Sequence, residues 1–202
     1  FENGVLNLDE LSKLVKANTK GIVLTHASNV TGNITDIRKV GDFCRENNLI
    51  FVVDASQTAG AFNIDMKEMN IDVLCFTGHK SMLAPQGVGV LCVREEIYIR
   101  PLIVGGSGTH SYDEFQPDKM PTRLEAGTLN AHGIAGLHVS IEYILRNKME
   151  NLTKRALELS RKFYDGVSKL SEVKIYGDFE TEYRAPIVSL NISDMDSSEV
   201  SS

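Results

Sequence analysis

The stretch "VLCFTGHKSMLAPQGVGVLCV", residues 73–93, shows how the chain is built. An apolar run ends in Thr77, Gly78, His79 and Lys80, and a loop containing proline and glycine leads to a second apolar run. Short apolar runs bounded by such residues predict buried strands. An ammonium group at the end of a buried strand is costly unless it is paired or neutralised. Lys80 therefore either reaches solvent or takes part in chemistry.

Strand and helix patterns alternate around this stretch. Apolar, strand-like runs cover residues 21–26, 49–55 and 73–78, and amphipathic helical patterns cover residues 8–18 and 35–48. Strands that alternate with helices favour an α/β fold, in which a mostly parallel sheet is flanked by helices. We therefore predict such a sheet for the first half of the chain.

The pattern changes in the second half. Residues 103–130 form a glycine-rich stretch that we predict to be a long loop, and long ordered loops usually serve function or lie at interfaces. Helical patterns follow at residues 131–148 and 150–170. The second helix has an apolar stripe that predicts one buried face, made of Leu152, Ala156, Leu159, Phe163, Val167 and Leu170.

Two short strand patterns, residues 173–177 and 185–192, come after these helices. They indicate that a second structural unit begins there. We expect residues 1–148 to be part of a large α/β domain whose N-terminal portion is missing. We expect residues 149–202 to be the start of a smaller, truncated C-terminal α+β domain.

The composition excludes several classes of protein. The 202 residues are 42% hydrophobic and 24% charged, with a net charge of −6, and no basic patch suggests nucleic-acid binding. No apolar run is long enough to span a membrane. Cys44, Cys75 and Cys92 lack metal-type spacing and are predicted to be buried, reduced thiols of a cytoplasmic protein. Because the chain begins at Phe1 without an initiator methionine, we expect a piece of a longer protein.

Polar residues follow three of the predicted strands at the point where each strand ends. In open parallel sheets, ligands bind at the carboxyl ends of the strands. Taken singly, each residue has an ordinary explanation, such as a turn cap for an aspartate or a solvated side chain for a lysine. Together they indicate a ligand site: His26 and Asn29, then Asp54 and Gln57, then Thr77, His79 and Lys80.

These residue types match the needs of one cofactor, pyridoxal phosphate. Its aldehyde forms an imine with an amine, which Lys80 supplies once desolvation and the cationic ring have lowered the pKa of the amine below about 10.4. The ring nitrogen must stay protonated, which requires a buried carboxylate, and Asp54 is the candidate. Thr77 and His79 are placed to bind the phosphate. No metal is expected.

Four motifs carry a family resemblance: "THASNVTGN", "DASQTAG", "FTGHKSMLAPQGVGVL" and "RLEAGTLN". In this order they resemble the class V aminotransferase family of pyridoxal-phosphate enzymes, and within it the cysteine desulfurases and selenocysteine lyases. The resemblance extends over nearly the whole chain. It implies the fold type I architecture of the pyridoxal-phosphate-dependent transferases.

The resemblance also implies a role for each matching residue. Lys80 would hold the cofactor covalently, and Asp54 would pair with the ring nitrogen. Gln57 would hydrogen-bond the phenolic oxygen of the cofactor, and Asn29 would lie near that oxygen and the substrate carboxylate.

Two further roles concern the phosphate of the cofactor. Thr77 and His79 would bind it within the subunit. Thr128 would reach the phosphate of the other subunit, because the family builds its sites across a homodimer interface. The alternative for Thr128 is a plain loop hydroxyl.

The resemblance predicts a cysteine desulfurase that converts cysteine to alanine and passes sulfur on as a persulfide, with a sulfur-acceptor protein as a partner. In such enzymes the phosphate-binding glycine–threonine loop and the ring stacked on the cofactor precede residue 1. The catalytic cysteine and the substrate-binding arginine follow residue 202. None of the three cysteines of the chain replaces that nucleophile, so we expect the chain alone to be inactive.

Three alternatives remain at this stage. Another class V enzyme, such as a small-amino-acid aminotransferase or a selenocysteine lyase, would share every residue named above. A nucleotide-binding α/β protein would need G-x-G-x-x-G after its first strand, whereas residues 105–108 offer only G-G-x-G in a loop. A non-catalytic relative is the third, and the intact Lys80, Asp54 and Gln57 oppose it.

Overall fold

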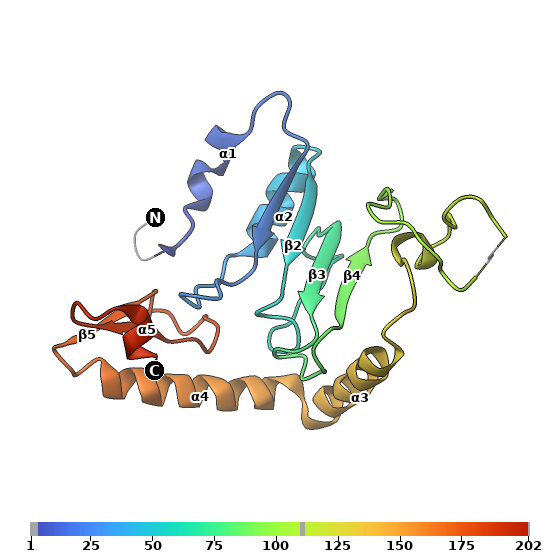
Figure 1. Ribbon diagram of the computed structural model, residues 1–202. Helices are drawn as coiled ribbons and strands as arrows, with labels where there is room; N and C mark the ends of the chain where they lie inside the picture. Colours follow the sequence, from blue (N-terminus) through green and yellow to red (C-terminus); the bar gives the residue numbers. More distant parts are fainter. Residues whose placement is uncertain (1–3, 110–111, 202) are drawn as a thin grey trace.

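A four-stranded mixed sheet forms the centre of the computed structural model, which describes residues 4–109 and 112–201 (Figure 1). Its strands are β1 (Gly21–Thr25), β2 (Ile50–Asp54), β3 (Val73–Thr77) and β4 (Gly89–Val93), in this spatial order. The first three strands are parallel, and β4 is antiparallel to β3. The predicted strands and the mostly parallel sheet are thus confirmed.

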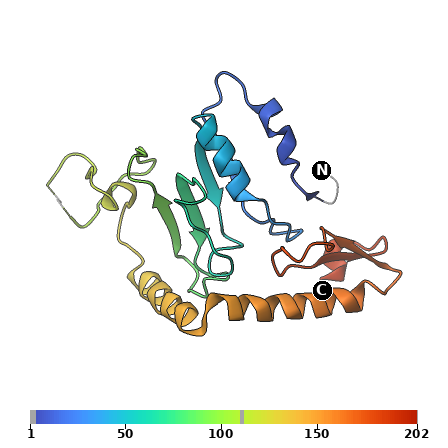
Figure 2. The same ribbon diagram turned by 180° about the vertical axis from the view of Figure 1, so that it is seen from behind.

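Helix α2 (Ile37–Glu46) packs on the sheet and lies in front of it in Figure 2. The helix begins after Asp36, whose side chain accepts a hydrogen bond from the backbone N–H of Lys39 at 3.0 Å. Its apolar face has the predicted spacing of three and four residues. The core between helix and sheet contains Ile37, Val40, Cys44, Phe51 and Val53, all at most 3% exposed.

The helix predicted for residues 8–18 is shorter than its sequence pattern suggests. A single 3-10 turn, η2 (Leu8–Glu10), leads into the four-residue helix α1 (Leu11–Leu14). Val15 then adopts extended backbone angles and ends the helix. None of the residues in η2 or α1 is fully buried, so tertiary packing does not prolong this short helix.

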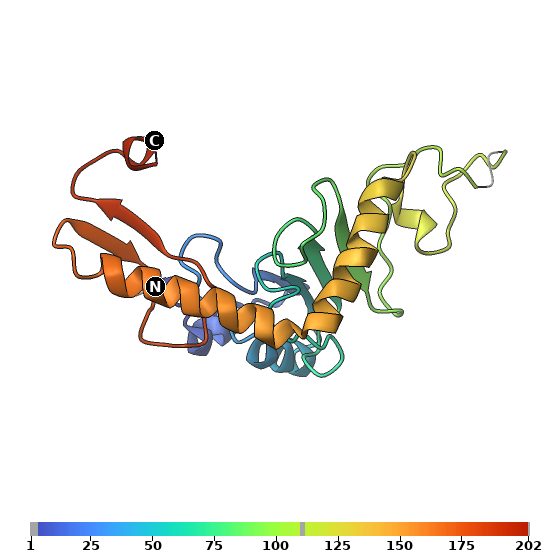
Figure 3. The same ribbon diagram turned by 90° about the horizontal axis from the view of Figure 1, so that it is seen from below.

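Two long helices, α3 (Ala131–Asn147) and α4 (Met149–Val167), confirm the helical patterns of the second half. They meet at Lys148, which has a φ of 61°, and Figure 3 shows the angle between them. The loop that precedes α3 contains the 3-10 turn η3 (Thr122–Leu124) and extends away from the sheet in Figure 1. Within the described ranges, no helix has the length and apolar character that crossing a membrane requires.

Strands β5 (Val173–Tyr176) and β6 (Ser189–Ile192) form a separate antiparallel sheet, followed by the short helix α5 (Ser197–Val200). Helix α4 runs from the central sheet to this smaller sheet (Figure 3). The division expected after residue 148 falls where α3 and α4 meet. The outer ends of the two expected domains, residues 1–3 and residue 202, lie outside the described residues.

The predicted buried face of α4 is only partly confirmed, since Leu152 packs against the core but other residues of the stripe are exposed. No residue of α4 is fully buried, and Leu159 and Phe163 are 50% and 49% exposed. The half-buried side of the helix also includes Thr153 and Tyr164, which lie outside the predicted stripe. The Thr153 hydroxyl donates to the carbonyl of Ala61 at 2.6 Å, and the Tyr164 ring stacks on the Phe179 ring with the two centroids 4.0 Å apart.

The turn after β2 is in backbone contact with the loop after β3. Gly60 lies in the first segment with a φ of +80°, and a Cβ atom there would lie 2.6 Å from the carbonyl oxygen of Ser81 in the second. Only glycine combines this backbone conformation with so close an approach. Since Ser81 follows Lys80 directly, Gly60 sets the spacing between the segments that carry Gln57 and Lys80.

We expect Gly60→Ala to lower the free energy of unfolding by about 2–4 kcal/mol, because the new methyl group adds steric overlap to an unfavourable φ. Gly166→Ala is the matched control, since no atom lies within 4 Å of the added methyl group, and Gly166 belongs to α4. Its free energy of unfolding should stay constant or rise by up to about 1 kcal/mol. Urea denaturation measures both, and equal effects of the two substitutions would contradict the proposed contact.

Candidate active site at the carboxyl edge of the sheet

The three parallel strands end at the same edge of the sheet. Thr25 of β1 is level with Asp54 of β2, and Asp54 is level with Cys75 of β3. Backbone bonds continue this pairing beyond the strands, from the His26 N–H to the Asp54 carbonyl at 2.9 Å and from the Ala55 N–H to the Cys75 carbonyl at 2.8 Å. The predicted convergence of the strand ends is therefore confirmed.

Asp54 is half-buried, and the turn that it begins orients its carboxylate. Its Oδ1 accepts a hydrogen bond from the backbone N–H of Ser56 at 2.8 Å. Burial, and to a lesser extent the Asp54 charge, raises the pKa of the Cys75 thiol. Gln57 lies half-buried in the same turn. The arrangement presents an oriented anion and an amide at the end of β2.

Thr77 and His79 form a polar pair at the end of β3. The Thr77 hydroxyl and the His79 Nδ1 are 2.7 Å apart. A backbone hydrogen bond closes the loop between β3 and β4, on which His79 lies. The Gly78 N–H donates to the Val88 carbonyl at 2.9 Å. Thr77 is half-buried and His79 is exposed, so the pair can meet an anion from solvent.

Lys80 is exposed, and its ammonium makes no hydrogen bond or ion pair with any residue of the described ranges. The expected desolvation of this amine at the strand end is wrong for the chain by itself, because β3 ends three residues earlier, at Thr77. The lysine instead lies on the loop, whose turn is closed by a bond from the Leu83 N–H to the Lys80 carbonyl at 2.8 Å. The Lys80 side chain is therefore accessible to a ligand that approaches this edge.

Asn29 and Thr128 are both exposed, and they lie on different loops. Asn29 is on the loop after β1, which is closed by a bond from the Gly32 N–H to the Ser28 carbonyl at 3.0 Å. Thr128 lies two residues before Asn130, the N-cap of α3. The Asn130 Nδ2 donates to the Gly87 carbonyl, in the loop after β3, at 3.0 Å. The strand-end residues thus gather at one edge, whereas Thr128 belongs to a separate exposed segment.

His26 has a structural role that the sequence pattern did not reveal. Its side chain is 1% exposed, and its Nδ1 lies 2.9 Å from the Thr58 hydroxyl. Burial lowers the pKa of His26 to about 4, against the opposing effect of the Asp36 charge. The sequence indicated a polar residue at the end of this strand but not its partner, which lies 32 residues away.

Arg184 is a second residue that the sequence analysis missed. It is 5% exposed, and its Nη2 donates to the carbonyls of Thr31 at 2.8 Å and Ile187 at 2.7 Å. The guanidinium also bonds the Asp178 carbonyl and lies 3.4 Å above the centre of the Phe179 ring. Arg184 therefore joins the loop of Asn29 to the C-terminal segment, a contact between residues 153 positions apart.

The thiols of the chain are unsuited to nucleophilic attack. Cys44 is buried, and burial raises its pKa to about 11. Cys75 and Cys92 are half-buried rather than buried as predicted, and burial raises their pKa values as well. A thiol with a raised pKa is protonated near neutral pH and hence a weak nucleophile.

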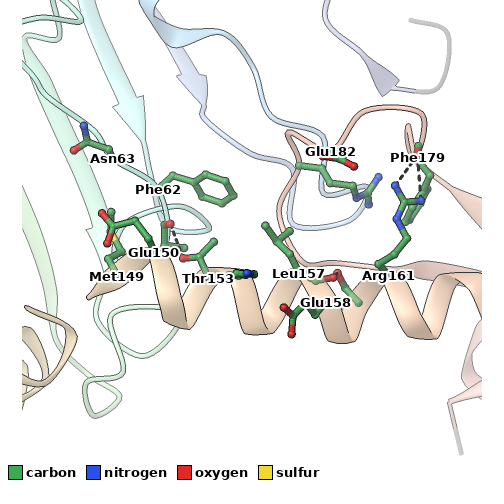
Figure 4. A pocket seen from close by; sticks show the side chains of 14 residues that line it. Phe62, Asn63, Met149, Glu150, Thr153, Leu157, Glu158, Arg161, Phe179 and Glu182 are labelled. Atoms are coloured by element: carbon green, nitrogen blue, oxygen red, sulfur yellow. Dashed lines mark hydrogen bonds between the residues drawn. The ribbon is translucent and has the colours of Figure 1, made fainter. Parts of the chain in front are cut away.

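A cavity of about 570 Å³ lies along α4 and is lined by residues other than those at the strand ends (Figure 4). Phe62 and Met149 line one end, and Arg161 and Phe179 line the other. Both guanidinium Nη atoms of Arg161 lie 3.4 Å from the Phe179 carbonyl oxygen. The cavity lies between the turn after β2 and the C-terminal segment, and its lining contains none of the predicted cofactor ligands.

The model of the family described as "Aminotransferase class-V" matches residues 1–202. The chain belongs to the class V aminotransferase family. The resemblance inferred from the sequence motifs is thereby confirmed. Members of this family are pyridoxal-phosphate-dependent enzymes, so the expected cofactor is that of the family.

Curated class V relatives of the chain carry the name cysteine desulfurase. A probable cysteine desulfurase of Methanothermobacter thermautotrophicus is 30% identical, and the match covers 98% of the chain and 50% of the relative. Cysteine desulfurase IscS of Vibrio campbellii is 34% identical over 88% of the chain and 41% of the relative. The chain spans about half the length of the curated relatives it matches.

Solved structures agree with the family assignment. The apo structure of cysteine desulfurase from Thermococcus onnurineus NA1 is 33% identical, with a TM-score of 0.88 over 98% of the chain and 50% of that structure. Cysteine desulfurase CsdA of Escherichia coli is 26% identical, with a TM-score of 0.84 over 95% of the chain and 48% of that structure. The expected fold class is confirmed.

The pKa of His26 predicts a pH dependence of stability. His26 is neutral in the folded protein down to about pH 4, whereas an unfolded histidine takes up a proton near pH 6.5. Because the unfolded state binds more protons between these values, stability should fall as the pH drops from 6.5 to 4, by up to about 3 kcal/mol. Urea denaturation across this range measures the fall.

His26→Asn removes the titrating group, so its free energy of unfolding should fall less than that of the wild type as the pH drops from 6.5 to 4. His138→Asn is the control, since the His138 side chain is 74% exposed. The control should retain the wild-type pH dependence. Parallel curves for the wild type and His26→Asn would show that His26 is not buried in its neutral form.

Proposed function

We propose that the protein containing this chain is a pyridoxal-phosphate-dependent cysteine desulfurase. A cysteine substrate and a protein thiol would give alanine and a protein persulfide, which balances atoms and electrons without an added oxidant. The observation that carries the proposal is the convergence of Asp54, Gln57, Thr77, His79 and Lys80 at one edge of the sheet. Class V membership and the names of the similar proteins support it.

The chemistry of these side chains fits the cofactor. Pyridoxal phosphate presents an aldehyde, a ring nitrogen and a phosphate, which need an amine, a carboxylate and hydrogen-bond donors. Lys80 offers an amine without an ion-pair partner among the described residues. Asp54 offers a carboxylate held by a backbone N–H, and Thr77 and His79 offer a hydroxyl and a ring nitrogen 2.7 Å apart.

Each residue has a distinct task in this proposal. When bound, the cofactor supplies an electron-accepting ring. Asp54 holds a proton on the ring nitrogen, and Thr77 with His79 binds the phosphate. Gln57 orients the ring through its phenolic oxygen, and Asn29 lies near that oxygen and the substrate carboxylate.

Lys80 has two tasks. Its amine attaches the cofactor, and it then moves the α-proton of the substrate. A thiol outside residues 1–202 attacks the substrate sulfur, because the raised pKa values of Cys44, Cys75 and Cys92 keep these thiols protonated.

We also propose that a second copy of the chain covers the loop before α3. This loop exposes a group of apolar side chains, and such patches on soluble proteins mark contact surfaces. The most exposed are Tyr112, which is fully exposed, Leu102 at 97%, Phe115 at 80% and Ile103 at 72%. Thr128 lies at the end of the same loop. A homodimer formed through this surface would let Thr128 serve the phosphate of the neighbouring subunit.

The remaining proposals concern the setting of the protein. The free thiols Cys44, Cys75 and Cys92 support a reducing compartment such as the cytoplasm. A persulfide product supports a sulfur-accepting partner protein. We retain residues 1–148 and 149–202 as two domains, supported by the separate sheet of β5 and β6.

We expect Lys80→Ala to lower alanine formation from cysteine by about a thousandfold or more in the full-length protein, because the attaching amine is lost. Borohydride should fix the cofactor to the Lys80 peptide of the wild type, as detected by mass spectrometry. Lys67→Ala is the control, since Lys67 is an exposed lysine in the turn that precedes β3. A Lys80→Ala variant with near-normal turnover would overturn the assignment.

The role of Thr128 can be tested with mixed dimers. Thr128→Ala alone should lose about tenfold in turnover through one hydrogen bond to phosphate. If Thr128 serves the neighbouring subunit, a dimer of one Lys80→Ala and one Thr128→Ala subunit contains one intact site. Its turnover should be roughly half that of the wild type. Turnover at or below that of the Thr128→Ala dimer would place Thr128 in its own subunit's site or in neither.

A further inference from the structure

His26 is bonded to both ends of the turn that carries the proposed ring-binding residues. Its backbone N–H donates to the Asp54 carbonyl at 2.9 Å, and its side-chain Nδ1 lies 2.9 Å from the Thr58 hydroxyl. Both His26 and Thr58 are at most 1% exposed. The five residues from Asp54 to Thr58, with Gln57 among them, are thus held at each end by one buried histidine.

The Thr58 hydroxyl lies between two partners. It is 2.9 Å from the His26 Nδ1 and 3.3 Å from the carbonyl oxygen of Ala55. Burial keeps the ring neutral, since it lowers the pKa of His26 to about 4, and the Asp36 charge only partly opposes this. The result is a relay of two hydrogen bonds that begins at the His26 ring and ends at Ala55.

The relay stiffens a turn that is already closed by its own backbone. The N–H groups of Thr58 and Ala59 both donate to the Ala55 carbonyl, at 2.9 and 2.8 Å, and the Ser56 N–H binds the Asp54 carboxylate at 2.8 Å. The positions of Ala55 and Thr58 therefore help to fix the turn that carries Asp54 and Gln57. A residue that fixes both ends of the turn sets the direction of the side chains between them.

We propose that His26 and Thr58 are positioning residues for the cofactor ring. They hold the Asp54 carboxylate and the Gln57 amide in the geometry that the ring nitrogen and the phenolic oxygen require, although neither touches the cofactor itself. The inference rests on the proposed function. Residues behind the ligands of a site often control its chemistry in this way, because they fix the orientation of the groups that bind.

A positioning role of His26 and Thr58 can be distinguished from a purely structural role by a property of the bound cofactor. Loss of a buried hydrogen bond lowers stability wherever it occurs. Only a positioning pair also changes a property of the bound cofactor. The visible absorbance of pyridoxal phosphate attached to a lysine changes with pH as the attached cofactor loses a proton. A hydrogen bond from Gln57 to the phenolic oxygen favours the deprotonated form of the attached cofactor. A displaced Gln57 should therefore raise the pH midpoint of this change.

The test compares Thr58→Val with Thr58→Ser in the full-length protein loaded with pyridoxal phosphate. Valine keeps the shape of threonine without the hydroxyl, and serine keeps the hydroxyl. Thr58→Val should raise the midpoint by about half a pH unit or more, which is roughly a threefold change in the titration constant. It should also lower kcat by about tenfold with a smaller change in KM. Thr58→Ser should match the wild type.

Ser140→Ala is the control for the loss of a buried hydroxyl. Ser140 is 7% exposed and donates to the Leu137 carbonyl at 2.9 Å within α3, outside the strand-end loops. Its midpoint should equal that of the wild type. If Thr58→Val does not fold, His26→Leu and His26→Asn replace the pair. Asparagine keeps a donor near the Nδ1 position and leucine does not, so only His26→Leu should shift the midpoint.

A midpoint within about 0.1 pH unit of the wild type in Thr58→Val, or in His26→Leu where that pair is used, would overturn the positioning role. The proposed function would then stand, because the wild type still binds and titrates the cofactor. If the wild-type protein develops no visible absorbance with pyridoxal phosphate, both the proposed function and this inference fail.

Discussion

The in-register parallel pairing of β1, β2 and β3 is the constraint on which the candidate site depends. Because Thr25, Asp54 and Cys75 are level across the three strands, the segments that follow them must leave the sheet at one edge. Gly60 then brings the second of these segments into backbone contact with the third, at Ser81. An acid and an amine that are 26 positions apart in the sequence, at Asp54 and Lys80, are thereby held at one edge of one sheet.

Solvent exposure increases along this edge from β1 to the loop after β3. His26 is buried and neutral, Asp54 is half-buried and oriented by a backbone N–H, and Lys80 is exposed. The fixed acid and the free amine suit a cofactor that needs one charge held in place and one covalent attachment.

The sequence predicted the parts of the fold that local patterns determine. Apolar runs located β1 to β4, and the apolar spacing located α2, because short-range sequence patterns control these elements. Leu159 and Phe163 of α4 were predicted to be buried but are exposed, since periodicity cannot tell which part of a stripe a neighbour covers. The strand-end residues were found because a parallel sheet gathers them. The contacts of His26 with Thr58 and of Arg184 with Thr31 are long-range, and no local pattern encodes them.

The central claim is that the strand edge holds the cofactor through the charge of Asp54. Turnover of Asp54→Asn in the full-length protein tests it, because asparagine can still accept the Ser56 N–H bond but cannot hold a proton on the ring nitrogen. Asp65→Asn is the control, since Asp65 accepts two backbone N–H bonds at 2.9 Å in a turn that precedes β3. The account predicts a loss of about a hundredfold or more in Asp54→Asn alone. Turnover of Asp54→Asn equal to that of Asp65→Asn would contradict it.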